Sequence, residues 1–302
     1  MSLRNSYRGG FWSLSARYTK TTMIISSEGL YPFRAFTIPD KFKQKAKDEL
    51  FETDENRDNA IQRLRELVTD DTDLGCRITD DFLLKFLRAR KFNIPKAFNL
   101  VKKHMSFKKK NQDIFTDMDF EVLSKLIKKK VFSFLPYRCK DGCAVFVVHL
   151  DNWNPSQFTI KDICKGVVIF LYHSICDPLT QINGYKIIFD VKSRGIKHIR
   201  YCTPAYLYLL YTGTQECFPG RFKEIHILNM SLTFQLAWKL ISPFLSEKLK
   251  KRMVFHEDYK GLNKYFPTSI IPVELDGELK EYDTIPWLKT ATRPENLQKL
   301  AH

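Results

Sequence analysis

The stretch FPGRFKEIHILNM, residues 218–230, places a short apolar run directly before a long apolar segment. The run KEIHILNM follows Pro219-Gly220 and is short and apolar, which is typical of a buried β-strand. Arg221 and Lys223 stand two residues apart at its start, so their side chains are expected to point the same way. We therefore predict a strand with two cations at its beginning.

The segment after this strand, SLTFQLAWKLISPFLSEKLKKRMVF over residues 231–255, is apolar on almost every side of a helical wheel before residue 243. A helix of this kind has to be covered by a protein core, by lipid or by a ligand. Pro243 is expected to break or kink the helix, because proline removes a backbone hydrogen bond and clashes with the preceding turn. Beyond Pro243 the segment becomes basic, which suits a helix at a membrane interface. A core helix packed on a sheet is the alternative.

Strand-like and helix-like runs alternate on the N-terminal side of this region. The strand-like runs are KVFSFLP (130–136), AVFVVHL (144–150) and GYKIIFDV (184–191), and the helix-like runs are TIKDICKGVVIFLYHSIC (159–176) and TPAYLYLLYTGTQECF (203–218). Such alternation implies βαβ crossovers and a largely parallel sheet. Residues 41–112 show helical periodicity instead, with Thr79 or Asp80 and Asn93 as candidate N-caps. The pattern predicts an α/β protein with a helical N-terminal subdomain.

The composition limits the possible partners. Of 302 residues, 49 are Lys or Arg and 34 are Asp or Glu, and the net charge of +15 suggests an anionic partner: nucleic acid, a phospholipid surface or an acidic protein. No stretch of the sequence reaches the ~20 apolar residues that a bilayer span requires. Seven cysteines without a regular framework favour a reducing compartment. Cys139 and Cys143 flank a turn, but no second Cys/His pair with ligand spacing stands near them, so we predict no metal site.

Five motifs occur in the order of a known family. They are DDFLLKFLRARKF (80–92), GYKIIFDV (184–191), FPGRFKEIHILNM (218–230), SPFLSEKLKKR (242–252) and YFPTSIIPVELDG (265–277). From about Glu49 to Tyr282 the chain resembles the CRAL-TRIO (Sec14-like) lipid-binding proteins, and most closely the α-tocopherol transfer protein group. The resemblance implies a helical N-terminal subdomain and a mostly parallel sheet flanked by helices, which enclose a hydrophobic ligand cavity under a mobile helical lid at about Asn229–Leu245.

The domains are expected to follow this resemblance. We predict a disordered or flexible basic tail over residues 1–40, the N-terminal helical subdomain over 41–115, the lipid-binding domain over 116–285 and a C-terminal tail over 286–302. The composition of residues 1–40 also partly resembles a mitochondrial transit peptide.

The phase of the predicted elements, together with the resemblance, gives candidate residues for the wall of the ligand cavity. These are Ile160, Val167, Phe170, Leu171, Tyr185, Phe189, Leu210, Ile225, Phe234 and Leu240. Ordinary core packing is the competing interpretation for each. Val167 and Leu171 stand where the tocopherol group has serines in its pocket helix. The cargo is therefore expected either to be more uniformly apolar than tocopherol (vitamin E) or to be held by other polar groups such as Tyr185 or His173.

The tocopherol group is also thought to bind phosphoinositide headgroups through a basic cluster near the lid. The corresponding residues are Arg90, Arg221, Lys223, Lys248 and Arg252, all cationic in this chain. Lys248 and Arg252 are four residues apart and so are neighbours on a helix face. Arginine offers paired donors to phosphate oxygens. For Arg90, an internal salt bridge with a carboxylate of the N-terminal subdomain is the alternative.

These observations predict a cytoplasmic lipid-binding or lipid-transfer protein that associates transiently with endosomal or other phosphoinositide-containing membranes. Its one hydrophobic cargo is expected to be tocopherol-, retinoid- or other isoprenoid-like. A lipid-regulated phosphoinositide sensor or adaptor without net transfer is the alternative. We expect no cofactor besides the cargo and no enzymatic activity, because G-x-G-x-x-G, P-loop and G-x-S-x-G motifs are absent from the sequence. We also expect no nucleic-acid partner, because aromatic residues are not interleaved with the lysine runs.

Overall fold

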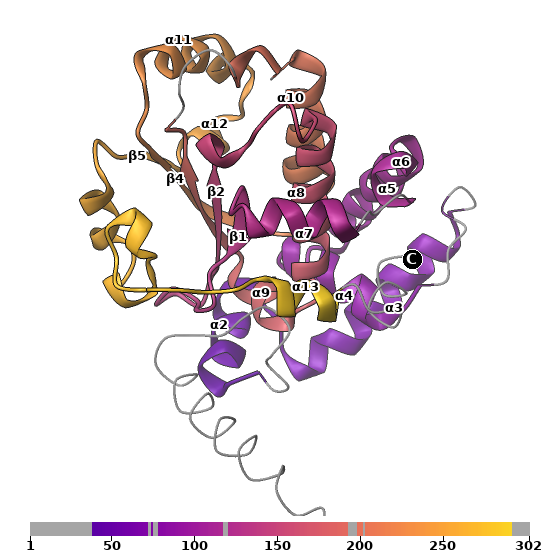
Figure 1. Cartoon of the computed structure of the whole chain (residues 1–302). Helices are drawn as coiled ribbons and strands as arrows, with labels where there is room; N and C mark the ends of the chain where they lie inside the picture. The colour runs from indigo at the N-terminus through magenta and orange to yellow at the C-terminus, as the bar shows by residue number, and fades with distance from the viewer. Residues whose placement is uncertain are drawn as a thin grey trace, which may run out of the picture.

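The computed structural model of the chain describes residues 38–71, 74, 78–116, 120–192, 198–201 and 203–291 (Figure 1). The basic tail predicted over residues 1–40 lies outside this part of the chain except for residues 38–40. The first elements are the helices α2 (Asp40–Leu50), α3 (Asp54–Thr69), α4 (Asp80–Ala89), α5 (Ile94–Lys110), α6 (Gln112–Thr116) and α7 (Phe120–Lys128).

Two of the N-terminal helices begin at residues that the sequence marks as caps. Thr79 Oγ1 accepts a hydrogen bond from the backbone N–H of Phe82 at 3.2 Å, and Asn93 Oδ1 accepts one from the N–H of Lys96 at 3.0 Å. Each bond satisfies a donor that the first helical turn otherwise leaves without a partner. The apolar stripes of α3, α4 and α5 then meet in one buried cluster, so the predicted helical subdomain is confirmed.

A five-stranded sheet follows in the centre of the molecule. Its strands are β1 (Phe132–Phe134), β2 (Ala144–His149), β3 (Tyr185–Asp190), β4 (Phe222–Leu228) and β5 (Met253–Phe255), and this is also their spatial order. β1 is antiparallel to β2, whereas β2 to β5 run parallel. The parallel strands are connected through α8 (Ile160–Ser174), α9 (Pro178–Asn183), α10 (Pro204–Tyr211), the π-helical turn η3 (Thr212–Glu216), α11 (Leu232–Ile241) and α12 (Glu247–Lys250). The predicted mostly parallel sheet is confirmed.

The two faces of the sheet are covered by different parts of the chain. Successive parallel strands lie side by side, and right-handed crossovers then place their connecting helices on one face. Figure 1 shows α8 and α10 on one side of the sheet and the turns that follow β5, over residues 259–275, on the other. On the helical face Phe146 packs with Phe170 of α8. On the opposite face Ile188 shares a buried cluster with Leu262 and Phe266.

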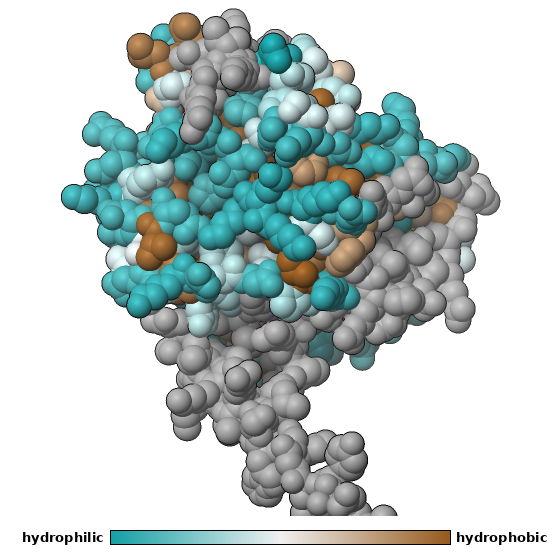
Figure 2. All heavy atoms as spheres, viewed as in Figure 1, coloured by the Kyte–Doolittle hydropathy of each residue, from teal (hydrophilic) through white to brown (hydrophobic). Residues whose placement is uncertain are grey.

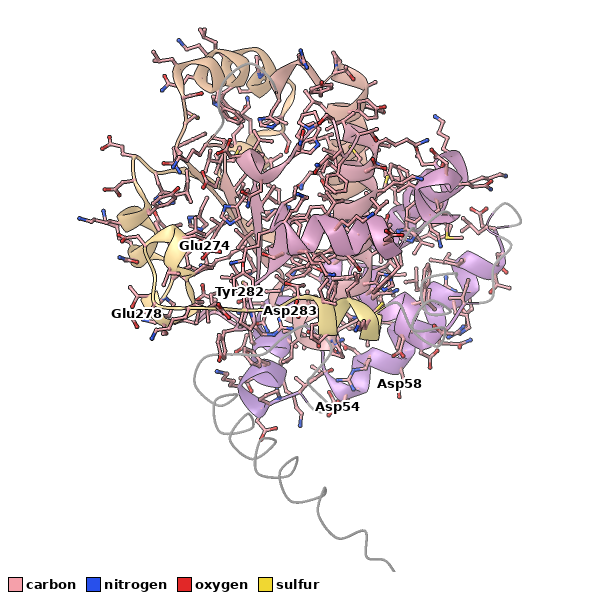
Figure 3. The ribbon with its side chains drawn as sticks, viewed as in Figure 1. Asp54, Asp58, Glu274, Glu278, Tyr282 and Asp283 are labelled. Carbon is pink, nitrogen blue, oxygen red and sulfur yellow. The ribbon has the colours of Figure 1, made fainter. Side chains whose placement is uncertain are left out.

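The segment after β5 returns along the sheet to β1. The Glu274 carboxylate accepts a hydrogen bond from Lys130 at 2.8 Å, and the Tyr282 hydroxyl lies 2.9 Å from Ser133 Oγ in β1. Figure 3 shows Glu274 and Tyr282 along this returning segment. These contacts fasten the C-terminal part of the chain to the antiparallel edge of the sheet.

The chain then forms the helix α13 (Ile285–Ala291), where we expected the C-terminal tail to begin at residue 286. Its Trp287 ring lies 4.7 Å from the ring of Phe170, centroid to centroid, and Trp287 and Leu288 are both buried. The first turns of this segment therefore belong to the core.

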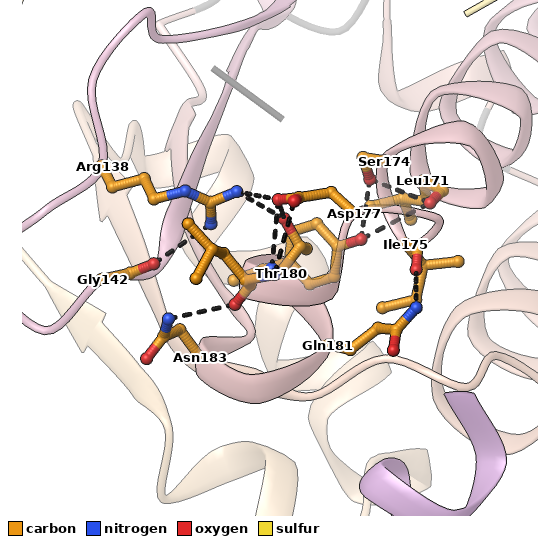
Figure 4. A network of polar contacts seen from close by, with 11 residues as sticks. Arg138, Gly142, Leu171, Ser174, Ile175, Asp177, Thr180, Gln181 and Asn183 are labelled. Atoms are coloured by element: carbon orange, nitrogen blue, oxygen red, sulfur yellow. Dashed lines mark hydrogen bonds and ion pairs between the residues drawn. The ribbon is translucent and has the colours of Figure 1, made fainter. Parts of the chain in front are cut away.

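A buried arginine holds the turn between β1 and β2 against α9 (Figure 4). Arg138 donates hydrogen bonds to the Asp177 carboxylate, to Thr180 Oγ1 at 2.9 Å and to the carbonyl of Gly142 at 3.1 Å. Asp177 is itself the N-cap of α9. A buried charge is tolerated only when it is paired and hydrogen-bonded, as this one is.

A second buried arginine joins the helical subdomain to the sheet domain. Arg88 of α4 donates to Glu52 at 2.6 and 2.8 Å and to Gln181 of α9 at 2.6 Å. The charge-assisted pair with Glu52 is bidentate, and its two parallel hydrogen bonds fix the orientation of the guanidinium relative to the carboxylate as well as their separation.

Candidate functional site

Three neighbouring strands carry apolar side chains that the fold leaves only partly buried. Ile187 of β3, Ile225 of β4 and Met253 of β5 are register partners, and Phe189 follows Ile187 on the same face. All four are only partly buried, although parallel strands are normally covered on both faces. The helical face of the sheet therefore retains accessible apolar surface.

The helices α8 and α10, opposite this surface, also carry apolar side chains that are only partly buried. Ile160 and Val167 of α8 are partly buried at the margin of the main core. α10 has the sequence PAYLYLLY, yet none of its residues is fully buried, and Leu210 is half-buried. An apolar helix in a globular protein normally buries at least one face. α8 and α10 thus leave part of their apolar surface open.

α11 is anchored at the carboxyl ends of the strands. Its Phe234 ring lies 6.5 Å from the ring of Phe189, and its Trp238 ring lies 5.4 Å from that of Phe255. Two residues further along a helix the side chain points to the opposite side. Accordingly, Leu232 and Leu236 face away from these contacts and are 78% and 63% exposed.

The exposed side of α11 forms an apolar patch on the surface. Hydrophobic atoms stand out at the top of the molecule in Figure 2, over α11. The helix ends at Ile241, directly before Ser242-Pro243, so the predicted break at Pro243 is confirmed. The side chain of Leu240, a predicted wall residue, lies outside the described residues.

Three further predicted wall residues lie in the packed core. Phe170 and Leu171 are almost fully buried in the main cluster. The Tyr185 hydroxyl lies 2.7 Å from Ser174 Oγ, and burial raises the pKa of this phenol well above its usual value. The structure therefore brings Ile160, Val167, Phe189, Leu210, Ile225 and Phe234 to accessible apolar surface, whereas Phe170, Leu171 and Tyr185 are covered by other side chains.

His173, the other polar group considered for the cargo, is also buried. Burial lowers the pKa of its imidazole to about 4. Its Nε2 has no hydrogen-bond partner among the described residues. The side chain is therefore neutral at physiological pH.

Several cations come together where α4, α12 and the start of β5 meet. Arg90 follows α4, Lys248 lies on α12 and Arg252 directly precedes β5. Partial burial lowers the pKa of Lys248, and so do four positive charges around it, those of Arg252, Arg90, Lys91 and Lys96. Burial also lowers the pKa values of Arg90 and Arg252. We call Arg90, Lys91, Lys96, Lys248 and Arg252 the basic cluster.

Among the described residues, the central cations of the basic cluster have no acidic partner. In the part of the chain that the structure describes, no carboxylate forms an ion pair with Arg90, Lys248 or Arg252. The salt bridge considered for Arg90 belongs to its neighbour Arg88, which pairs with Glu52. Uncompensated cations that repel one another favour the binding of an anion between them.

Arg221 and Lys223 have a carboxylate partner instead. Glu49 Oε2 lies 3.0 Å from Lys223 Nζ and 3.8 Å from an Arg221 guanidinium nitrogen. Arg221 also donates a hydrogen bond to the carbonyl of Ile182. Burial lowers the pKa of Arg221, Glu49 opposes this shift, and Arg252 adds to it. The two cations thus reach the same side, as expected from their spacing, and Arg221 lies within electrostatic range of the basic cluster.

Sequence reasoning missed Glu49, Lys91 and Lys96. Lys91 adjoins Arg90 in DDFLLKFLRARKF, so the second cation was visible in the motif. Glu49 is 174 residues away from Lys223 in the sequence, and no local pattern reports such a pair.

Within the described ranges, no three His, Cys, Asp or Glu side chains are grouped so as to hold a metal ion. No helix in these ranges has the length and hydropathy needed to cross a bilayer.

Two family models match the chain: "CRAL/TRIO domain" over residues 128–277 and "CRAL/TRIO, N-terminal domain" over residues 39–103. Clavesin-2 of Rattus norvegicus is 33% identical over 253 residues, which are 82% of this chain and 77% of that protein. Clavesin-1 of Rattus norvegicus is 31% identical over 258 residues, 83% of this chain and 72% of that protein. The crystal structure of Sfh5 matches with a TM-score of 0.49 and 12% identity, covering 83% of this chain and 92% of the other. A particular closeness to the α-tocopherol transfer protein group stays a prediction.

Proposed function

The chain belongs to the CRAL/TRIO family, and from this membership we propose that it carries one hydrophobic small molecule and releases it at phosphoinositide-containing membranes. Family membership supports lipid binding or transfer. The observation that carries the finer proposal is the partly buried apolar surface of β3, β4 and β5 beside α11. The cargo that suits such a surface is tocopherol-, retinoid- or other isoprenoid-like.

The hydrophobic effect is sufficient to hold such a cargo. A ligand that buries ~400 Å² of apolar surface gains ~10 kcal/mol relative to water, at ~25 cal/mol per Å². Most of that gain is also available inside a bilayer. The cavity therefore has to compete with the bilayer for the cargo. Release requires that the cargo contacts lipid when the cavity opens.

α11 is the element that we propose to move. Phe234 and Trp238 contact the sheet, whereas Leu232 and Leu236 are exposed. When closed, the inner side covers the cargo. When open, both apolar sides of the helix can contact acyl chains, so the membrane itself stabilises the open state.

The basic cluster is the proposed contact with the phosphoinositide headgroup, together with Arg221 and Lys223. Arg90, Lys248 and Arg252 supply charge without a carboxylate partner among the described residues. Each cation near an anionic membrane contributes ~1 kcal/mol. Lys248 and Arg252 lie just after α11 in the sequence, so headgroup binding would bring the membrane to the lid.

We further propose that the protein is cytoplasmic, associates transiently with endosomal or other membranes, and has no enzymatic activity. A lipid-regulated phosphoinositide sensor or adaptor is the second candidate, because the same two sites would serve it. The two differ in one measurement: a sensor binds cargo and membrane without moving cargo between vesicles.

The first test is a lipid extract of the purified full chain. Protein from cells is extracted with organic solvent and analysed by mass spectrometry, and uptake of labelled α-tocopherol and retinol from vesicles is measured in parallel. We expect one hydrophobic molecule per chain or saturable uptake. An empty extract together with no uptake from vesicles would refute the cargo proposal.

The second test separates membrane binding from cargo binding. Flotation of the protein with vesicles that contain phosphatidylinositol bisphosphate is compared with its flotation with vesicles in which phosphatidylserine supplies the same net charge. We expect stronger binding to the phosphoinositide. Equal binding would leave a general anionic surface as the partner, and binding to oligonucleotides alone would favour a nucleic-acid partner.

A further inference from the structure

A groove of about 630 Å³ lies between α5 and the α10–η3 segment. None of the residues of the proposed cargo wall or the basic cluster lines it. Its walls are formed by Lys102, Lys103, Ser106, Phe107, Lys110, Asn111, Ala205, Tyr206, Tyr208, Leu209, Thr212, Glu216 and Cys217. Lys96, in the basic cluster, and Lys110 are 14 positions apart on α5, which corresponds to about 20 Å along a helix. The Lys110 end of the groove is therefore distinct from the basic cluster.

The groove runs along two antiparallel segments. At one end, Lys103 lies within electrostatic range of Cys217. In the middle, Gly213 packs so closely on Phe107 that an added Cβ would lie 2.7 Å from the ring. Because the two segments run in opposite directions, Lys110, three residues after Phe107, lies toward α10. Lys103 therefore lies at the end of the groove that contains Cys217 and its neighbour Glu216, and Lys110 lies toward the other end.

The two ends differ in charge. The pKa of the Cys217 thiol rises to about 11; burial is the main cause, the charge of Glu216 adds to the rise, and the charge of Lys103 opposes it. Lys102 is paired with Asp71 at 2.9 Å. Lys110 has no ion pair with any described residue, and it stands in the last turn of α5 beside Lys109. The Lys110 end thus has positive charge without an ion-pair partner in the described part of the chain.

The floor of the groove is apolar and packed. Phe107 is buried, and its ring meets that of Phe115 edge to face at 6.2 Å. Leu209 is half-buried at the margin of the main core. The opposite wall contains η3, and π-helical turns occur frequently at functional sites. Thr212, the first residue of η3, has a buried hydroxyl without a hydrogen-bond partner among the described residues.

We infer that this groove binds a small anionic amphiphile, a carboxylate or phosphate ester with an aliphatic or aromatic body. Its volume lies in the range of small-molecule sites, ~300–1,000 Å³. The anionic group pairs with Lys110, and the body lies along Phe107 and Leu209. The reverse orientation, with the anionic group at the Cys217 end, is disfavoured because the Glu216 carboxylate would repel that group. An acidic peptide would meet the same charges but would extend past both ends of the groove.

The test uses the full chain and decanoate, titrated by calorimetry below its micelle concentration, with decanol as the neutral probe. Lys110→Glu reverses the charge at the proposed head site, and we expect it to weaken decanoate binding about tenfold or more, the scale of one charged hydrogen bond. Lys109→Glu is the matched control, because Lys109 is the neighbouring exposed lysine and does not line the groove. Decanol binding should be the same in both variants.

A second variant fills the groove without changing its charge. Ala205→Trp places a large ring at an exposed lining position, and we expect it to abolish saturable decanoate binding while uptake of neutral cargo from vesicles stays intact. If both Lys110→Glu and Ala205→Trp bind decanoate as the unaltered chain does, the probe occupies another site and the inference is wrong. It is equally wrong if an acidic peptide binds in a Lys110-dependent way and decanoate does not. Neither result would bear on the proposed cargo or phosphoinositide sites.

Discussion

Glu49 Oε2 lies 3.0 Å from Lys223 Nζ, so a carboxylate of α2 occupies part of the site proposed for phosphate. Burial alone would raise the pKa of Glu49, but the hydrogen bond and charge of Lys223, with Lys45 and Arg221, lower it below its ordinary value. Glu49 is therefore ionised at neutral pH. Within the described ranges, the cationic surface thus has a compensated half at Arg221 and Lys223, which Glu49 contacts, and an uncompensated half at the basic cluster.

Removal of this internal carboxylate should strengthen membrane binding. Glu49→Gln keeps the shape of the side chain and removes a charge that competes with phosphate. We expect affinity for phosphatidylinositol bisphosphate vesicles to rise about three- to tenfold, since one charge near a membrane contributes ~1 kcal/mol. Glu66→Gln is the control, because Glu66 pairs with Arg63 on the exposed face of α3. Weaker binding of Glu49→Gln would mean that the carboxylate orients Lys223 for the headgroup.

Charge reversal in the uncompensated half should have the opposite effect. Lys248→Glu is expected to weaken binding to the same vesicles about tenfold or more at low salt, and less at high salt because ions screen exposed charges. Lys128→Glu makes the same change at an exposed position on α7. Cargo uptake from neutral micelles should not change. Parallel loss of cargo uptake would show that Lys248 supports the fold.

The exposed side of α11 should matter for transfer and not for folding. Leu236→Glu places a charge where the side chain is 63% exposed. We expect the free energy of unfolding to change by less than ~0.5 kcal/mol, as for most surface substitutions, while cargo transfer between vesicles slows severalfold. Urea unfolding and a fluorescence transfer assay measure the two quantities. Normal transfer by this variant would exclude insertion of this side of α11.

Acid should destabilise the fold through His173. Its pKa is lowered to about 4 by burial, below the ~6.5 of an unfolded chain. The unfolded state therefore binds more protons between these values, and stability falls as pH drops from 6.5 toward 4. By pH 5 the loss from this group is about 2 kcal/mol. In His173→Phe, which sacrifices no hydrogen bond with a described residue, the fall measured by urea unfolding at pH 7 and pH 5 should be smaller. An unchanged fall would locate the acid sensitivity elsewhere.

The buried Arg138–Asp177 pair should be costly to break. Arg138→Met leaves the Asp177 carboxylate buried without its cation, and we expect a loss of about 3–5 kcal/mol in the free energy of unfolding. Arg63→Met removes an exposed partner of Glu66 and should cost less than ~1 kcal/mol. A similar small loss for Arg138→Met in urea unfolding would mean that Asp177 is compensated by its backbone and Thr180 contacts alone.

Local patterns predicted most of the architecture correctly. Asn93 and Thr79 cap helices where the sequence indicated, and the helix after β4 ends before Pro243. Of the residues predicted to line the cavity wall, some are accessible in the structure and others are buried in the core. Val167 and Phe189 are only partly buried, whereas Phe170, three residues after Val167 on the same helix, is covered by β1 and α13. Helical phase alone does not reveal which neighbour covers a given side chain.

The sequence alone determined the order of helices and strands, the parallel sheet, the apolar character of α11 and the surplus of positive charge, because periodicity, caps and charge depend on residues only a few positions apart. The tertiary structure decided which of the described cations pair with a carboxylate. Arg88 rather than Arg90 meets Glu52, and Glu49 meets Lys223 across 174 positions. The pKa of a cation, and its availability to an anionic ligand, depend on its burial and on the nearest opposite charge. Both are set only when distant segments pack together.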